Sequence, residues 1–119
     1  MSQYIDGFAF PIAKDRIADY QPIAEAIATV WKEHGALAYF EYQGDDMFLE
    51  GTSSFVDTLN LAEGETAVFG WVIFDSKETR DKANELVSAD PRVEQLMQTD
   101  VGFDPSRMVY GGFKALIQT

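Results

Sequence analysis

Thr66-Ala-Val-Phe-Gly-Trp-Val-Ile-Phe74 is the stretch of the sequence that decides the fold. Phe69 and Trp71 lie on one of its alternating faces, Val68 and Val72 lie on the other, and no residue in it is charged. A strand with one face in water alternates between apolar and polar residues, whereas a strand buried on both faces is apolar throughout. The stretch therefore predicts a strand that is central in its sheet and covered on both sides.

Three more strands are predicted around it, from runs of apolar and aromatic residues bounded by turn-forming residues. They are Tyr4 to Phe10, which Pro11 closes, Ala36 to Gln43, and Met108 to Ile117. Turns are expected at Gly44-Asp45-Asp46 and over residues 62–65, because both segments combine glycine with acidic residues.

The first predicted helix runs from Asp15 to His34. Its apolar residues recur at three- and four-residue steps and form one stripe. Gly35 suits the left-handed conformation that commonly ends a helix. Pro22 is expected to break or kink this helix near Gln21, or to mark the start of its regular part.

The second predicted helix runs from Lys77 to Ala89 and is capped by Ser76. Asp90 then interrupts it, and a further helix begins at Pro91 and ends near Met97, since proline is favoured in a first helical turn. Residues 53–59 indicate another short helix.

The order of the main elements is strand, helix, strand, strand, helix, strand. This is the ferredoxin-like α+β arrangement, a four-stranded antiparallel sheet with both helices on one face. We expect residues 1–119 to form a single domain. The first and third strands are central in this topology and apolar on both faces, and an exposed apolar patch of that size is a liability. We therefore predict a homodimer in which two sheets pair as a dimeric α/β barrel.

Composition narrows the classes of function. The formal net charge is −11, from 20 acidic and 9 basic residues, so neither nucleic acid nor an anionic membrane is expected as a partner. The absence of cysteine removes disulfides and thiolate chemistry, and one histidine cannot build a multi-histidine site, so we expect no metal and no cofactor. The chain starts without a signal-peptide pattern, and no apolar run reaches the about 20 residues that span a membrane. These features predict a cytoplasmic protein.

The negative charge is concentrated in the segment 33–76, which contains no lysine or arginine. This segment is either a solvated acidic surface or a docking face for a cationic partner. Within it, Asp45 and Asp46 are either ordinary turn formers or, with nearby carboxylates, ligands for a hard cation. Their spacing matches no EF-hand loop.

Asp6 and His34 are the candidates for a general base. Asp6 alternates with Phe8 on a predicted central strand, and a buried carboxylate needs either a partner, such as Arg107 or a tyrosine hydroxyl, or a raised pKa. Such groups gather in functional sites. His34, the only histidine, has a near-neutral pKa that suits a base. Its place in the last turn of a helix equally allows a purely structural role.

Four residues are candidates for lining a pocket: Tyr39, Glu41, Trp71 and Tyr110. The glutamate lies between tyrosines on a predicted strand and poses the same question as Asp6. The rings are able to stack a planar ligand, although such rings also serve as core or as dimer interface.

Short stretches spread in order over almost the whole chain point to a family. They are Tyr4-Ile-Asp-Gly-Phe, Trp31-Lys-Glu-His-Gly-Ala, Gly44-Asp-Asp, Val68-Phe-Gly-Trp, Ser76-Lys-Glu-Thr-Arg-Asp-Lys-Ala-Asn84, Asp90-Pro-Arg and Arg107-Met-Val-Tyr-Gly-Gly-Phe113. This set resembles the YbaA-like bacterial proteins, a domain family of unknown function in the dimeric α/β-barrel superfamily. Pro22 and Gln43 depart from the usual pattern. The resemblance implies the ferredoxin-like fold and a dimer, and it implies no established activity.

Two hypotheses for function follow. The first is an uncharacterised homodimer that binds a small ligand at the open sheet face. The alternative is a cofactor-independent monooxygenase or isomerase acting on a small aromatic or quinone-like substrate. In that case Asp6 or His34 serves as the base, while Trp71 and Tyr110 supply apolar walls. The enzyme hypothesis requires an enclosed pocket of about 300 Å³ or more that contains a carboxylate or an imidazole.

Overall fold

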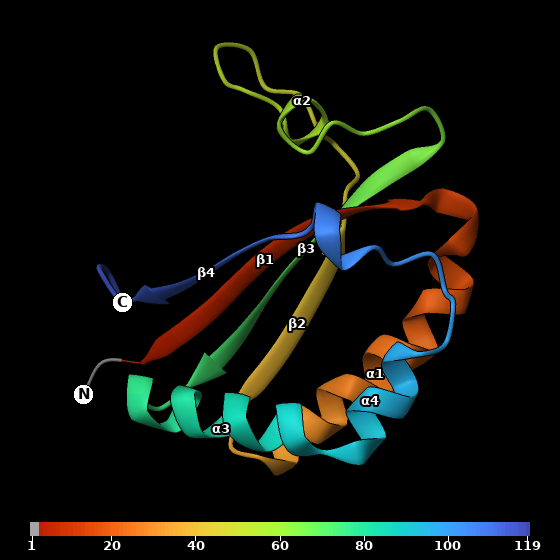
Figure 1. The fold of residues 1–119 in the computed structure, drawn as a ribbon. Helices are drawn as coiled ribbons and strands as arrows, with labels where there is room; N and C mark the ends of the chain where they lie inside the picture. The colour runs from red at the N-terminus through yellow and green to blue at the C-terminus, as the bar shows by residue number, and fades with distance from the viewer. Residues whose placement is uncertain (1–2) are drawn as a thin grey trace.

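The computed structural model of the protein describes residues 3–119 and contains a single four-stranded sheet (Figure 1). Its strands are β1 (Tyr4–Ala13), β2 (Ala38–Gln43), β3 (Glu65–Phe74) and β4 (Val109–Lys114). The order across the sheet is β2-β3-β1-β4, and every neighbouring pair is antiparallel. The predicted ferredoxin-like α+β fold, with the first and third strands in the centre, is confirmed.

The helices are α1 (Ile17–Glu33), α2 (Phe55–Thr58), α3 (Lys77–Ala89) and α4 (Pro91–Met97), with 3-10 turns η1 (Lys14–Arg16) and η2 (Pro105–Arg107). As predicted, Ser76 caps α3, its hydroxyl accepting a hydrogen bond from the Thr79 N–H. Gly35 adopts a φ of 122° where α1 ends. No helix among residues 3–119 is long and apolar enough to cross a membrane.

Three local predictions were wrong. Pro11 does not close β1, which continues to Ala13. The proline lies beyond Ala9, the last residue that β1 pairs with β4. The β1–β4 ladder needs no N–H at this position, so proline, which lacks one, costs that ladder no hydrogen bond.

The other two concern Pro22 and the turn after β2. Helix α1 is not broken near Gln21 but runs through Pro22 without interruption. Residues 44–49 form an irregular segment rather than a turn. The connection from β2 to β3, which includes α2, projects beyond the end of the sheet (Figure 1).

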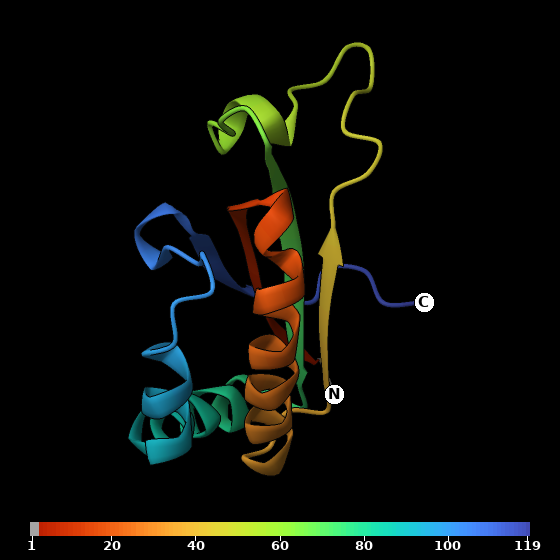
Figure 2. The same cartoon turned by 90° about the vertical axis from the view of Figure 1, so that its right-hand side faces the viewer.

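The strand register separates the residues of the sheet into two faces. One row across the sheet consists of Asp6 of β1, Val72 of β3 and Tyr39 of β2. The next row on the same face consists of Tyr110, Phe8, Gly70 and Glu41. Helices α1, α3 and α4 all lie on the side to which these side chains point (Figure 2). We call this side the helix face.

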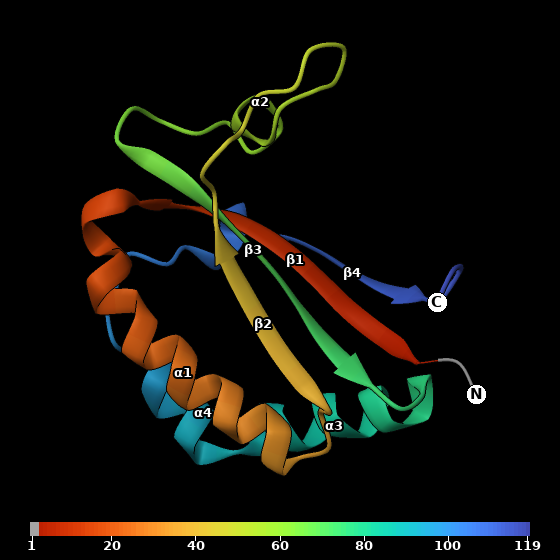
Figure 3. The same ribbon diagram turned by 180° about the vertical axis from the view of Figure 1, so that it is seen from behind.

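The opposite side, which we call the open face, has no helix of residues 3–119 crossing it (Figure 3). Its side chains are apolar and aromatic, and two of the largest, Phe69 and Phe113, are 46% and 55% exposed. A groove of about 600 Å³ runs over this face and has no charged residue in its wall. Within one chain, therefore, β3 is buried along its helix face, whereas on the open face Ala67 is buried under Leu59 and Phe69 stays exposed.

Candidate functional site

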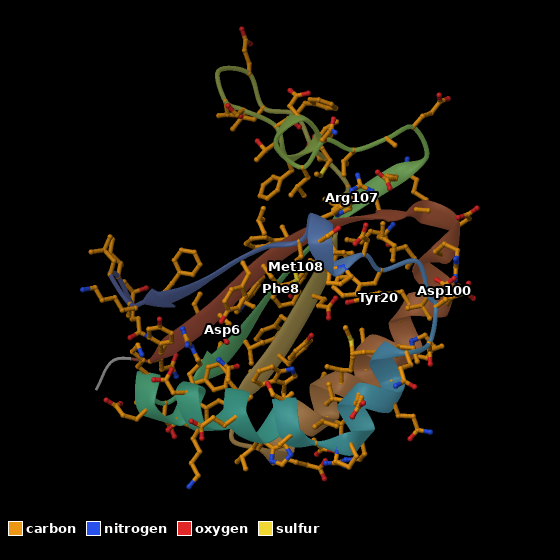
Figure 4. The ribbon with its side chains drawn as sticks, in the orientation of Figure 1. Asp6, Phe8, Tyr20, Asp100, Arg107 and Met108 are labelled. Atoms are coloured by element: carbon orange, nitrogen blue, oxygen red, sulfur yellow. The ribbon has the colours of Figure 1, made fainter. Side chains whose placement is uncertain are left out.

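A cavity of about 520 Å³ lies between the helix face of the sheet and the three helices. The side chains of Asp6, Phe8, Tyr20 and Met108 all border it and enter from β1, α1 and the segment before β4 (Figure 4). Its volume exceeds the about 300 Å³ expected of a ligand pocket, and its wall is mostly aliphatic and aromatic.

Aromatic side chains form much of the cavity wall. Phe10 packs edge-on against Phe103 and Tyr20, with ring centroids 4.7 and 5.5 Å apart, and all three rings line the cavity. Trp31 packs edge-on against Phe74 at 6.0 Å and forms part of the wall from α1. The apolar stripe predicted for α1 therefore faces a ring-lined space and does not lie flat against the sheet.

A polar cluster centred on Asp6 lies in this apolar wall. Asp6 is 3% exposed, and its Oδ1 accepts a hydrogen bond of 2.7 Å from the Tyr110 hydroxyl. Arg80 Nε lies 3.1 Å from the same oxygen. The Nε–H of Arg80 makes no directed hydrogen bond among residues 3–119, so this is a contact between charges. Of the two partners expected for Asp6, the structure supplies a tyrosine hydroxyl, and Arg80 takes the place expected of Arg107.

Burial raises the pKa of Asp6, and the hydrogen bond from Tyr110 and the charge of Arg80 oppose that rise. Burial, together with the hydrogen bond to Asp6, raises the pKa of Tyr110 to about 12. The cluster thus places a carboxyl of raised pKa on the wall of an apolar cavity, and carboxyls with such shifted pKa values gather in functional sites.

Gly112 allows Arg80 to reach Asp6. It pairs with Asp6 across the β1–β4 ladder, and a Cβ atom at Gly112 would collide with Arg80 Nη2 and with the Tyr4 hydroxyl. Arg80 Nη2 donates to that hydroxyl at 3.0 Å. The guanidinium therefore lies directly over the glycine.

We expect Gly112→Ala to displace Arg80 and lower the free energy of unfolding by about 2 kcal/mol, because a buried charge contact is weakened. Urea unfolding of the purified protein measures this. Gly111→Ala is the matched control, since its methyl group would meet only the Phe113 ring, at 3.3 Å, on the open face. Equal losses in the two variants would contradict the assigned role of Gly112.

Glu41 is the centre of a second polar cluster. Its two carboxylate oxygens accept hydrogen bonds from the hydroxyls of Tyr20 and Tyr39, the latter at 2.8 Å. Burial raises the pKa of Glu41, and both hydrogen bonds oppose the rise. Glu41 lines a smaller cavity of about 370 Å³ between α1 and β2, and both tyrosines border this cavity as well as the main one.

The raised pKa of Glu41 predicts a pH-dependent effect of Glu41→Gln. A carboxyl whose folded-state pKa lies above its ordinary 4.5 stabilises the fold most below pH 4.5, and this contribution is lost as the pH rises through the folded-state pKa. Glutamine removes that loss, so we expect Glu41→Gln to gain stability relative to wild type between pH 4 and pH 7.5. Denaturant unfolding at both pH values measures the change.

Glu65→Gln is the control and has the opposite expected sign. Hydrogen bonds from Arg107 lower the pKa of Glu65, so its contribution is present above pH 4.5 and is lost as the pH falls through the lowered pKa. Glu65→Gln should therefore lose stability relative to wild type at pH 7.5. If the two variants respond to pH in the same direction, the assignment of Glu41 is wrong.

The structure does not bring all of the predicted site residues together. Asp6, Tyr39 and Tyr110 line the main cavity, and Glu41 lies behind Tyr39. Trp71 lies on the open face, stacked at 5.4 Å on Tyr42. Among the described residues, Trp71 is absent from the lining of the main cavity, but it lines the groove of the open face together with Tyr110.

His34 is also separate from the cavity wall. It follows the last residue of α1, and its Nε2 lies 2.8 Å from Asp90 Oδ2. Hydrogen bonds from Arg92 and His34 hold the pKa of Asp90 well below its usual range. The pair joins the end of α1 to the junction of α3 and α4, which is a structural place in the fold.

Asp45 and Asp46 are exposed and lie in the irregular segment after β2. Over residues 3–119, no group of three or more His, Asp or Glu side chains is placed so that it could hold a metal ion.

Sequence reasoning missed Arg80 and Asn84, which accompany Asp6 and Tyr110. A signal was present, since Arg80, Ala83, Asn84 and Val87 recur at three- and four-residue steps on α3 and mark its inner stripe. An arginine on the inner side of an amphipathic helix needs a buried partner. Asp6 is the carboxylate that meets this need.

Comparisons with known proteins agree with the fold and with the resemblance seen in the sequence. Residues 3–105 match the family model described as "Protein of unknown function (DUF1428)". The chain is 35% identical over 115 residues to "Uncharacterized protein YbaA" of Escherichia coli (strain K12), and the match covers 97% of each chain.

Two solved structures share the fold at low identity. SnoaB, a cofactor-independent oxygenase from Streptomyces nogalater, superposes with a TM-score of 0.64 at 10% identity, covering 99% of this chain and 97% of the other. A dimeric ferredoxin-like protein from an uncultured marine organism superposes with a TM-score of 0.57 at 9% identity, covering 100% and 98%. At such identities the likeness concerns the fold alone.

Proposed function

This chain belongs to the DUF1428 family, which includes the YbaA proteins, and we propose that it is a homodimer that binds a small apolar molecule in the cavity between the sheet and the helices. The observation that carries the proposal is the combination of a ring-lined space of about 520 Å³ with one carboxyl, Asp6, on its wall. Cavities that are mostly apolar and contain a few convergent polar groups are the usual sites of small ligands.

The proposal places the ligand on the helix face rather than the open face. The groove of the open face has no charged residue on its wall, and its lining includes the exposed rings of Phe69, Tyr110 and Phe113. Such a surface suits a flat contact with a second copy. The dimeric ferredoxin-like protein of the same fold supports the proposal of a dimer.

A variant that fills the cavity tests the ligand site. Val93 of α4 lines the cavity, and Val93→Phe introduces a ring into that space. With 2-naphthol as the probe in isothermal titration calorimetry, we expect affinity to fall at least about tenfold in this variant, since part of the apolar contact is lost.

Leu86→Phe is the matched control, because Leu86 lies on α3 and is 39% exposed. It should bind 2-naphthol as wild type does. Undiminished binding by Val93→Phe, or no binding of any naphthalene derivative by the wild type, would contradict the proposed site.

A second candidate function is a cofactor-independent enzyme of the isomerase or oxygenase kind. The raised pKa of Asp6 and its place on an apolar wall favour it, and SnoaB shows that the fold accommodates an enzyme of this kind. In this proposal Asp6 removes a proton from an acidic C–H or O–H of the bound molecule.

Exchange of the α-hydrogens of 2-tetralone for deuterium in D₂O, followed by NMR, tests this base. We expect wild type to accelerate the exchange and Asp6→Asn to abolish the acceleration, because an amide does not accept the proton at neutral pH. Equal rates in the two proteins would leave binding as the function that the site supports.

A further inference from the structure

The hydroxyl hydrogens of the three tyrosines on the cavity wall are already in use. The Tyr110 hydroxyl donates its hydrogen to Asp6, and the Tyr20 and Tyr39 hydroxyls donate theirs to Glu41. A phenol has one hydrogen to donate and two lone pairs. These three tyrosines border the cavity, so each is able to offer a ligand only the acceptor lone pairs of its oxygen.

The wall also carries no positive charge. Asp6 is the one charged residue among the described residues that line the cavity, and no lysine, arginine or histidine of residues 3–119 is among them. Arg80, the nearest cation to Asp6, directs its nitrogens to Asp6, to the Tyr4 hydroxyl and to Asp81. The guanidinium nitrogens therefore already have partners and are not free to bind a ligand.

Asp6 still has an acceptor to offer. Its Oδ1 takes both the Tyr110 hydroxyl and the charge contact with Arg80, and over residues 3–119 no hydrogen bond is made to Oδ2. Asn84 and Thr99 contribute the other polar side chains of the wall, and the Asn84 amide, the Thr99 hydroxyl and one indole N–H are its remaining side-chain donors among residues 3–119. With the lone pairs of Asp6 and of three tyrosines beside them, the described part of the wall offers more acceptors than donors and no positive charge.

Resting on the proposed function, we propose that the ligand is a hydrogen-bond donor without negative charge, namely a hydroxyl or a protonated amine on an apolar frame, which donates to Asp6. A carboxylate or phosphate in this cavity would face acceptor oxygens and a carboxyl without a cation to compensate it, and a buried charge without a partner is strongly unfavourable. A donor group supplies a hydrogen bond to Asp6 Oδ2, and the rest of the ligand packs against the aromatic rings.

A series of probes on one carbon frame tests the inference on the wild-type protein. The probes are naphthalene, 2-naphthol, 2-naphthylmethylamine and 2-naphthoate, titrated at neutral pH by calorimetry. We expect 2-naphthol and the amine to bind about tenfold or more tightly than naphthalene, because a hydrogen bond to a charged group is gained. We expect 2-naphthoate to bind more weakly than naphthalene.

The same series on Asp6→Asn assigns the selectivity to Asp6. Asparagine keeps the shape and one carbonyl acceptor for Tyr110, so the penalty on 2-naphthoate should shrink about tenfold. Glu85→Gln removes a carboxylate on the exposed side of α3, outside the cavity, and is the matched control that should leave the selectivity unchanged. Should Asp6→Asn fail to fold, the order of affinities in the wild type still decides the inference.

Failures of the inference and of the proposed function give different results. If all four probes bind in a manner that Val93→Phe weakens, but 2-naphthoate binds as tightly as 2-naphthol, the donor requirement is wrong and the cavity remains a binding site. If no probe binds, or if Val93→Phe changes nothing, the site itself is wrong.

Discussion

Phe69→Asp is expected to convert the proposed dimer into a monomer. Phe69 projects from the centre of the open face, where it contacts Phe55 and Trp71 at ring-centroid distances of 5.8 and 5.7 Å. In a two-fold dimer each substitution occurs twice, and burying two unpaired carboxylates costs several kcal/mol. We expect the dimer dissociation constant to rise by about a thousandfold or more.

Sedimentation equilibrium measures this effect directly. Wild type should sediment with twice the mass of the 13.3 kDa chain and Phe69→Asp with the mass of one chain. Leu86→Asp places the same charge on α3, outside the sheet, and should remain a dimer. A monomeric wild type would contradict the assignment of the open face as a dimer interface. It would not change the evidence for the cavity on the helix face.

Removing the charge of Arg80 is expected to cause the largest loss of stability at the site. Arg80→Met retains the apolar stem of the side chain and leaves Asp6 in the sheet without its cation. Breaking a buried ion pair from one side costs about 3 kcal/mol, since the remaining charge stays buried and unpaired. Urea unfolding at pH 7.5 measures the loss.

A double-mutant cycle separates the ion pair from the packing of Arg80. In Asp6→Asn/Arg80→Met no unpaired charge remains, so the double variant should be more stable than Arg80→Met alone. Losses that simply add would show that Asp6 and Arg80 do not stabilise each other, and the polar cluster would lose its physical basis.

The fold was predictable because its signals are local. The uncharged run from Thr66 to Phe74, the cap at Ser76 and the glycine at position 35 each determine an element through near neighbours, and the structure confirms all three. The order of elements then restricts the topology to few choices.

The site was less predictable because it depends on register and on docking. A slip of one residue between strands moves every side chain to the other face, and the sequence does not determine this register. For this reason Trp71 was expected beside Asp6. The actual pairing places Trp71 on the open face, where it shares a groove with Tyr110, whereas only Tyr110 also borders the cavity that contains Asp6.

The partner of Asp6 depends on how α3 docks. Arg80 and Asp6 are far apart in the sequence, and only the helix position over Gly112 brings them within 3.1 Å. The cavity itself has no sequence signal, because the same apolar stripe on α1 is compatible with a helix that packs tightly on the sheet.

The two tryptophans allow the central claim to be tested in one spectrum. Trp31 lines the main cavity and Trp71 lines the groove of the open face, and the chain contains no other tryptophan. A ¹⁵N–¹H correlation spectrum resolves one indole N–H signal for each, and Trp71→Phe assigns them. On titration with 2-naphthol, the cavity site predicts a shift of the Trp31 signal and an unchanged Trp71 signal. A shift of Trp71 with Trp31 unchanged would place the ligand on the open face and contradict the account.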